Sequence, residues 1–210
     1  IDDLYHASVN GHGAFVAAGN PTEFSEGIGS ALRAISARRG SGSNATVSGT
    51  STAAGGKVFQ AKYFAAKWYG ELQAYSVSSS GVNTSTPLWT ASIPAFATRK
   101  ILTHNGTAGA TFPTAAQTSV LTPDIADYLR GDRSKEQPDT TPSTGRIYRQ
   151  RTSLLGTIVD SSPTYVKASD GTETVYAGAN DGMMHAFDAN TGVERFAYVP
   201  RGLDLDELKT

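Results

Sequence analysis

Short segments in which apolar and polar residues alternate fill the chain after residue 160 and predict β-strands. Successive segments begin about ten residues apart, a spacing typical of strands joined by tight turns. The predicted strands are Pro163–Ala168, Thr174–Gly178, Met183–Asp188 and Glu194–Val199. The turn signals between them are Asp170-Gly171, Asp181-Gly182 and Asn190-Thr191-Gly192. Four such strands are what one β-propeller blade requires, but a β-sandwich starts in the same way, so the pattern leaves both open.

The preceding part of the chain is also strand-rich from Lys57 onward, although less regular. A hairpin is predicted over residues 58–77, turning at Trp68-Tyr69-Gly70. Further strands are predicted at Leu88–Ile93 and Arg99–Thr103, the second ending at Asn105-Gly106. Thr122 and Pro123 predict the start of a short helix that Gly131 closes. The charged and Pro-rich residues 132–145 predict a mobile surface loop.

Residues 1–39 have a different pattern, that of a strand followed by a helix. Gly13–Ala18 predicts a buried strand, and Asn20-Pro21-Thr22-Glu23 predicts a capped helix start. The apolar stripe that follows has helical spacing and needs partners from outside the chain. Its residues are Phe24, Ile28, Leu32 and Ile35. The Gly-, Ser- and Thr-rich residues 40–56 predict a linker, which divides an α/β part (1–39) from a β part (57–210). The β part is irregular over residues 57–150 and blade-like over residues 160–200.

Composition narrows the class of protein. The formal net charge is -1 and the isoelectric point is about 6.5, so the chain lacks the basic field that binds nucleic acid. No apolar run approaches the length of a membrane span. The absence of cysteine excludes disulfides, thiolate metal sites and cysteine nucleophiles. The opening Ile1-Asp2-Asp3 shows no signal-peptide pattern and is expected to be internal to a longer protein.

The turn after the third C-terminal strand has a specific motif. Residues 176–192 resemble the blade repeat of quinoprotein-like propellers, in which an Ala-x-Asp-x-x-Thr-Gly turn precedes an aromatic residue. The resemblance gives Asp188 and Thr191 the role of accepting backbone N–H groups, and Gly192 a positive φ. It also gives Phe196, where Trp is usual, a packing role between blades. Asp181 and Gly182 belong to the preceding turn of the same motif.

The order of motifs along the whole chain resembles one family, the PilC/PilY proteins of bacterial type IV pili. The matching segments are His6–Gly11 through Asn20-Pro21, Trp68–Leu72, Tyr128–Ser134, Leu155–Pro163 and Tyr176–Gly192. Thr157 departs from the acidic residue expected at its position.

This resemblance implies the fold and the role of the chain. Residues 1–39 would be the last strand and helix of a von Willebrand factor A-like α/β domain. The β part would be the opening blades of an incomplete quinoprotein-like propeller, completed by the remainder of the protein or by another chain. The implied function is pilus assembly, control of retraction and twitching, and adhesion to surfaces or host cells. Minor pilins at the pilus tip are the implied partners, and the location is extracytoplasmic. No cofactor is expected within this chain, because the calcium associated with the family is expected in other propeller sequence.

Arg130-Gly131-Asp132 has two interpretations. It is the tripeptide that integrins recognise, which requires both charged groups on an exposed, protruding turn. In the second interpretation, Gly131 is a helix C-cap residue, and the charged residues Arg130 and Asp132 flank it. The sequence predicts an exposed motif and leaves its receptor role open.

Other candidate sites have simpler structural explanations. The carboxylates at Asp170, Asp181 and Asp188 lack the alternating ligands of a calcium loop and are assigned to turns. His6 and His12 fit no metal-ligand spacing, and His185 is expected to be packed or hydrogen-bonded on its strand. Trp68 and Trp89 could form a ligand platform but are predicted in the blade core. The sequence predicts a binding module, and its alternatives are a mere scaffold or part of a quinoprotein dehydrogenase, whose catalytic residues are not found here.

Overall fold

A computed structural model of the chain describes residues 56–65, 67–138 and 143–205. It also describes residues 45–47 and a few earlier positions (6, 20, 22, 23, 25 and 26). The chain forms two compact units, residues 1–39 and 40–210. In the first unit, the Asn20 side chain accepts the backbone N–H of Glu23 at 3.0 Å, which is the predicted N-cap contact. The strand predicted over residues 13–18 and the apolar stripe lie outside the described residues.

The described part of the second unit is mainly β, as the sequence predicts, and its strands form two open sheets. The first sheet is built on the antiparallel pair β2 (Lys57–Phe64) and β3 (Tyr69–Ser78). Around this pair lie β1 (Ala45–Val47), β4 (Gly81–Val82) and β5 (Trp89–Thr90). β1 pairs with β2, and both β4 and β5 pair with β3.

The second sheet contains the predicted run of four antiparallel strands in sequence order. These strands are β8 (Thr164–Lys167), β9 (Glu173–Ala179), β10 (Met183–Asp188) and β11 (Glu194–Tyr198). Two more strands extend the sheet, β6 (Ile101–His104) and β7 (Gly109–Thr111). β6 pairs with β11 in parallel, so the full order is β7-β6-β11-β10-β9-β8.

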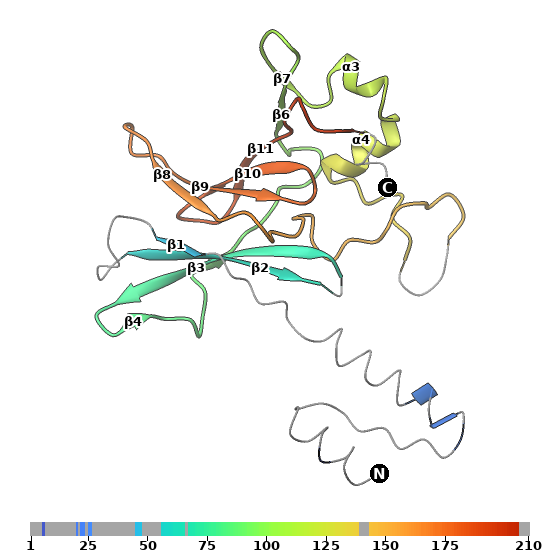
Figure 1. Cartoon of the computed structure of the whole chain (residues 1–210). Helices are drawn as coiled ribbons and strands as arrows, with labels where there is room; N and C mark the ends of the chain where they lie inside the picture. Colours follow the sequence, from blue (N-terminus) through green and yellow to red (C-terminus); the bar gives the residue numbers. More distant parts are fainter. Residues whose placement is uncertain are drawn as a thin grey trace. The chain divides into compact units, whose positions relative to one another are not determined.

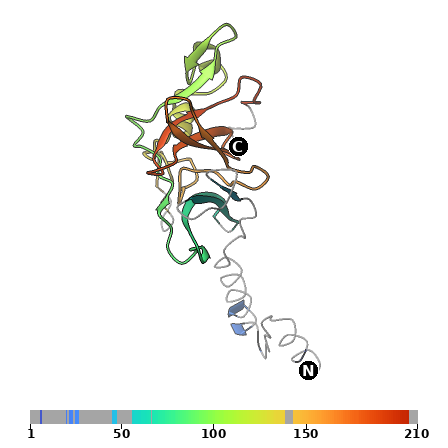
Figure 2. The same cartoon turned by 90° about the vertical axis from the view of Figure 1, so that its left-hand side faces the viewer.

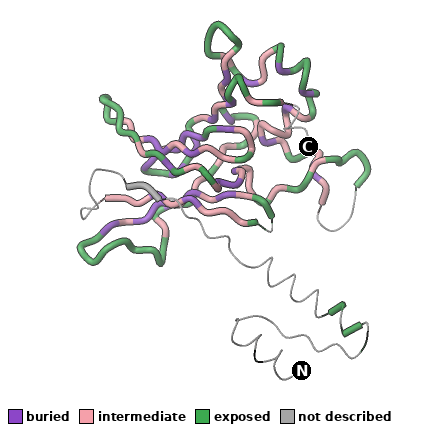
Figure 3. The backbone as a smooth tube through the Cα atoms, viewed as in Figure 1, coloured by how far each residue is buried: buried purple, intermediate pink, exposed green. Residues whose placement is uncertain are grey.

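The two sheets pack face to face around one apolar core (Figure 1). Phe59, Leu72 and Trp89 of the first sheet meet Val175 and Phe187 of the second. Strand alternation explains this, because every second residue of each strand faces the other sheet. Figure 3 shows the buried residues along the strands, with exposed residues at the tips of the hairpins.

Two short helices cover the far end of the second sheet, beside β6 and β11 (Figure 2). They are α3 (Ala115–Thr118) and α4 (Pro123–Arg130). The predicted ends of α4 are confirmed: Thr122 is the N-cap, and Gly131 is a C-cap with φ +116°. Ala126 of α4 packs on Ile101 and Val199 in a second apolar cluster.

Several sequence-based expectations are wrong in detail. Trp68 is not core: its side chain is 62% exposed, because Tyr69 and Gly70 already pair with β2 and the turn lies before them. The predicted linker contains β1, which gains ladder hydrogen bonds from β2. Residues 132–138 and 143–150 do not form a loose loop, because the buried Glu136 forms a bridge with Tyr148 and ties the two stretches together.

Candidate interaction site

The turn between β10 and β11 has the hydrogen bonds that the blade motif requires. Oδ1 of Asp188 accepts the backbone N–H groups of Asn190 at 2.8 Å and Thr191 at 3.0 Å. Gly192 has a φ of +75°, and a Cβ added there would lie 2.5 Å from Cε3 of Trp89. Trp89 Nε1 donates to the carbonyl of Ala189 at 3.2 Å, so this turn is held on the first sheet. The role of these residues as a propeller turn stays a prediction.

The turn between β9 and β10 contains Asp181, whose carboxylate contacts several parts of the chain. Asp181 Oδ1 accepts the N–H of Met183, and Oδ2 accepts the N–H of Gly156, both at 3.1 Å. The same carboxylate lies 3.0 Å from Nε2 of His185. Nδ1 of His185 lies 2.7 Å from Glu194, which also holds Arg99 through two nitrogens at 2.9 and 3.1 Å. These four residues form a chain of alternating charge, the Asp181–His185–Glu194–Arg99 network.

Burial determines the protonation states of this network. The His185, Glu194 and Arg99 side chains are at most 1% exposed. Burial favours the neutral form of His185, but the carboxylates of Asp181 and Glu194 outweigh it and raise the pKa to about 9. His185 is therefore an imidazolium at neutral pH, and the formal charges of the four residues cancel. The partner cations in turn lower the pKa of both carboxyls, against the effect of burial.

The network is suited to positioning elements and not to catalysis. Both ring nitrogens of His185 are occupied by carboxylates and the ring is 0% exposed, so it cannot exchange a proton with a substrate. Arg99 also donates to the carbonyls of Leu129 at 3.4 Å and Arg130 at 3.3 Å. The network thereby joins the end of α4 to β10, β11 and the segment at Gly156.

The face of the second sheet that points away from the first sheet carries a group of apolar residues and lacks a covering layer in the described structure. The register places Met184 opposite Tyr198, and Ala186 opposite both Tyr176 and Phe196. Tyr176 and Phe196 meet edge to face at 6.5 Å and cover Ala186. Met184 is 38% exposed and Val166 of β8 is 42% exposed. We call Val166, Tyr176, Met184, Phe196 and Tyr198 the open face.

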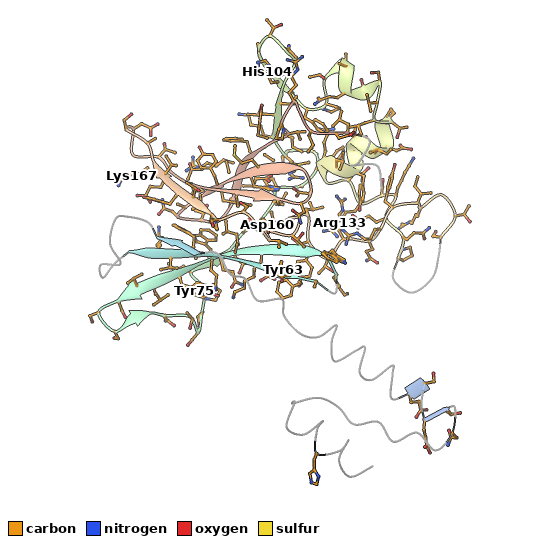
Figure 4. All side chains as sticks on the ribbon, viewed as in Figure 1. Tyr63, Tyr75, His104, Arg133, Asp160 and Lys167 are labelled. Carbon is orange, nitrogen blue, oxygen red and sulfur yellow. The ribbon has the colours of Figure 1, made fainter. Side chains whose placement is uncertain are left out.

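The outer face of the first sheet is mixed, with polar residues of β2 and β3 beside Val58, Tyr75 and Val77. Lys62 donates to Gln73 and to the hydroxyl of Tyr75, and Gln73 also bonds Glu71. Polar residues that satisfy one another can face water, whereas a contiguous apolar surface marks an interaction site. The free edge of the second sheet is protected as well, because β8 carries Lys167, which pairs with Glu173 (Figure 4).

The structure holds Arg130-Gly131-Asp132 as a helix cap and not as a protruding turn, so the expected exposure is wrong. Arg130 pairs with Asp127 at 3.1 Å, lies over the Phe96 ring and is 29% exposed in its side chain. The Asp132 carboxylate accepts the N–H and the hydroxyl of Ser134, both at 2.8 Å. These bonds lower the pKa of Asp132. Both charged groups are committed within the chain, and a receptor role for the tripeptide stays a prediction.

The remaining candidate residues are the possible metal ligands, Thr157 and His185. Among the described residues, no group of three or more His, Asp or Glu could hold a metal ion. Asp2, Asp3 and His12 lie outside the described residues. Thr157 is buried, and its hydroxyl accepts the Asn180 amide at 2.9 Å, so this position keeps a polar role without a charge. The prediction that His185 is hydrogen-bonded on its strand is confirmed.

Sequence reasoning missed Glu194 and Arg99. Glu194 begins the strand that follows the turn after the strand of His185, so the predicted hairpin brings the two residues near each other and a signal existed. The sequence gives no signal for Arg99. This residue comes near Glu194 only because β6 pairs in parallel with β11, which lies far along the chain.

Curated relatives match most of the chain. The chain is 35% identical over 197 residues to a type IV pilus biogenesis factor PilY1 homolog of Xylella fastidiosa, which covers 80% of the chain and 16% of the relative. It is 32% identical over 257 residues to the type IV pilus biogenesis factor PilY1 of Pseudomonas aeruginosa strain PAK. That match covers 95% of the chain and 21% of the relative. The Pseudomonas aeruginosa strain UCBPP-PA14 protein of the same name is 28% identical over a similar share.

These relatives are all named as type IV pilus biogenesis factors. The chain belongs to the PilC/PilY family. It spans about a fifth or less of the length of the relatives it matches. No protein-family model and no solved structure matches the chain. No helix in the described part of the chain is long and apolar enough to cross a membrane.

Proposed function

We propose that this chain is a binding and assembly segment of an extracytoplasmic type IV pilus protein, without catalytic activity of its own. In this proposal it acts at the pilus tip, the outer surface or the periplasm, in pilus assembly, control of retraction and attachment. Its β part is the opening of a quinoprotein-like propeller, and any calcium binds in other parts of the protein. The relatives' names support the link to pilus biogenesis.

The observation that carries the proposal is the open face. Propeller blades stack face to face, so a blade at the end of a partial stack leaves one apolar face uncovered. The two sheets of this chain pack face to face, and the open face of the second sheet exposes Met184 and Val166, as such an end blade would. The four-stranded run β8–β11 and the Asp188 turn are also what a blade requires.

The occupant of the open face in this proposal is the remainder of the same protein. The relatives are about five times as long as the matched region, so they contain enough further chain to supply another blade. Minor pilins then bind the completed assembly and do not bind the open face itself.

Met184→Asp in the full-length protein tests the function. A carboxylate buried against the next layer would remain unpaired, a change that costs several kcal/mol. We therefore expect loss of surface pili and twitching in a bacterium whose own copy has been deleted. Val82→Asp is the matched control, since Val82 is 40% exposed, compared with 38% for Met184, but lies on β4 of the first sheet. Normal twitching with both variants at wild-type protein levels would contradict the proposal.

A further inference from the structure

A pocket of about 770 Å³ lies away from the open face, between the β2–β3 turn, α4 and residues 147–156. Trp68 borders it from the turn, Tyr128 from α4, and Tyr148 and Arg149 from the later segment. Aliphatic side chains, including Ile125 and Leu155, complete much of its wall. The pocket thus combines aromatic, aliphatic and cationic groups in one concave surface.

Part of this wall is rigid before any ligand arrives. The rings of Tyr128 and Tyr148 stack at 4.5 Å, and the Arg151 guanidinium lies 3.7 Å from the centre of the Tyr128 ring. Arg151 is held by Glu136 at 2.6 Å, by the carbonyl of Tyr128 at 2.7 Å and by that of Asp132 at 2.9 Å. A preorganised wall reduces the entropy that a ligand loses on binding.

The rim presents apolar side chains that water would normally disfavour. Trp68 is 62% exposed and Ile147 is 68% exposed. Trp68 also has a φ of +48°, an unfavourable conformation for a bulky residue. Its indole is not among the core residues of the described part of this unit, so that core does not explain why an aromatic residue occupies this turn. Strain and exposure together are typical of residues that bind a partner.

One positive charge beside Trp68, that of Arg149, has no acidic partner among the described residues. Arg149 donates to the carbonyl of Lys67 at 2.8 Å, and no carboxylate of the described residues lies within ion-pair distance of it. The other charges around the pocket are paired: Asp124 with Lys135, and Arg151 with Glu136. Asp181, the remaining carboxylate on the pocket wall, pairs with His185. The pocket therefore complements an anionic group next to an apolar one.

We propose that this pocket binds a peptide segment of a partner protein, one that presents a large apolar side chain next to a carboxylate. The apolar side chain packs between Trp68, Tyr148 and Ile147, and the carboxylate pairs with Arg149. Trp, Tyr and Arg are the residues that dominate binding energy at protein interfaces. The aliphatic part of the wall favours an apolar side chain over a sugar ring, which would leave hydroxyl groups unpaired.

Intrinsic fluorescence tests the proposal on the whole 210-residue chain, because it contains two tryptophans, one exposed and one buried. The probes are three blocked peptides, acetyl-Ser-Phe-Asp-Leu-Ser-amide, its Asp-to-Lys analogue and an analogue with both apolar residues replaced by Ala. We expect a saturable blue shift with the first peptide, and about five- to tenfold weaker binding of the other two. Trp68→Phe removes the shift while the emission of Trp89 reports that the core remains folded.

Arg149→Gln separates the charge contribution from the apolar one. This variant should bind the Asp and Lys peptides equally, whereas Lys100→Gln, an exposed cation outside the pocket, should bind like the wild type. The proposal is overturned if none of the peptides gives a saturable shift at millimolar concentration, or if Arg149→Gln still prefers the Asp peptide. A shift produced by a neutral oligosaccharide such as maltopentaose and by none of the peptides would also overturn it, and would indicate a glycan site.

Discussion

Glu194→Gln is expected to lower the free energy of unfolding by about 3–5 kcal/mol, the usual result of removing one partner from a buried ion pair. The substitution preserves the shape of the side chain but leaves Arg99 and His185 charged, buried and without their shared carboxylate. Urea unfolding followed by circular dichroism measures the change.

Glu173→Gln is the matched control for this substitution. Glu173 also pairs with a cation, Lys167 at 3.2 Å, but the lysine is 60% exposed at the edge of the sheet. Exposed ion pairs contribute less than about 1 kcal/mol. Equal, small effects of the two substitutions would show that the network does not hold α4 and the second sheet together.

Gly192→Ala is expected to lower the free energy of unfolding by about 2–5 kcal/mol, from backbone strain and steric overlap combined. The residue has a φ of +75°, and an added Cβ would lie 2.5 Å from Cε3 of Trp89. The Trp89 ring cannot move aside freely, because it is packed against Phe59 and bonded to Ala189.

Gly171→Ala separates the two causes. Gly171 has a comparable φ of +86°, but an added Cβ would meet nothing within 4 Å. This variant should therefore lose only the backbone contribution of about 1–2 kcal/mol. If both variants lose the same amount in matched urea titrations, the contact between the turn and Trp89 does not contribute to stability.

Local signals explain which elements could be predicted. The sequence predicts both ends of each of the strands β8–β11 to within one residue, because alternation and Asp-Gly or Asn-Thr-Gly turns act within a few residues. The ends of α4 were predicted for the same reason, since capping by Thr122 and Gly131 is local. The short strands β1, β4 and β7 were missed, because they depend on a neighbouring strand more than on their own residues.

The contacts of the candidate sites were harder to predict because they join distant segments. The sequence showed Arg130-Gly131-Asp132, but the pairing of Asp132 with Ser134 and the long reach of Arg99 to Arg130 decide its exposure. Trp68 was assigned to the core from its residue type alone. In the structure the second strand of the hairpin begins two residues earlier than predicted, and Trp68 lies in the exposed turn before it.

The most direct test of the central claim is the accessibility of the open face, which the lack of cysteine makes straightforward to measure. Met184→Cys and Val82→Cys variants would be labelled with a maleimide, both in this 210-residue chain and in the full-length protein. We expect both thiols to react readily in the chain alone, where the two native residues are 38% and 40% exposed. In the full-length protein, Met184→Cys should be protected while Val82→Cys continues to react. Equally fast labelling of Met184→Cys in both proteins would contradict the claim that the open face is covered by the remainder of the protein.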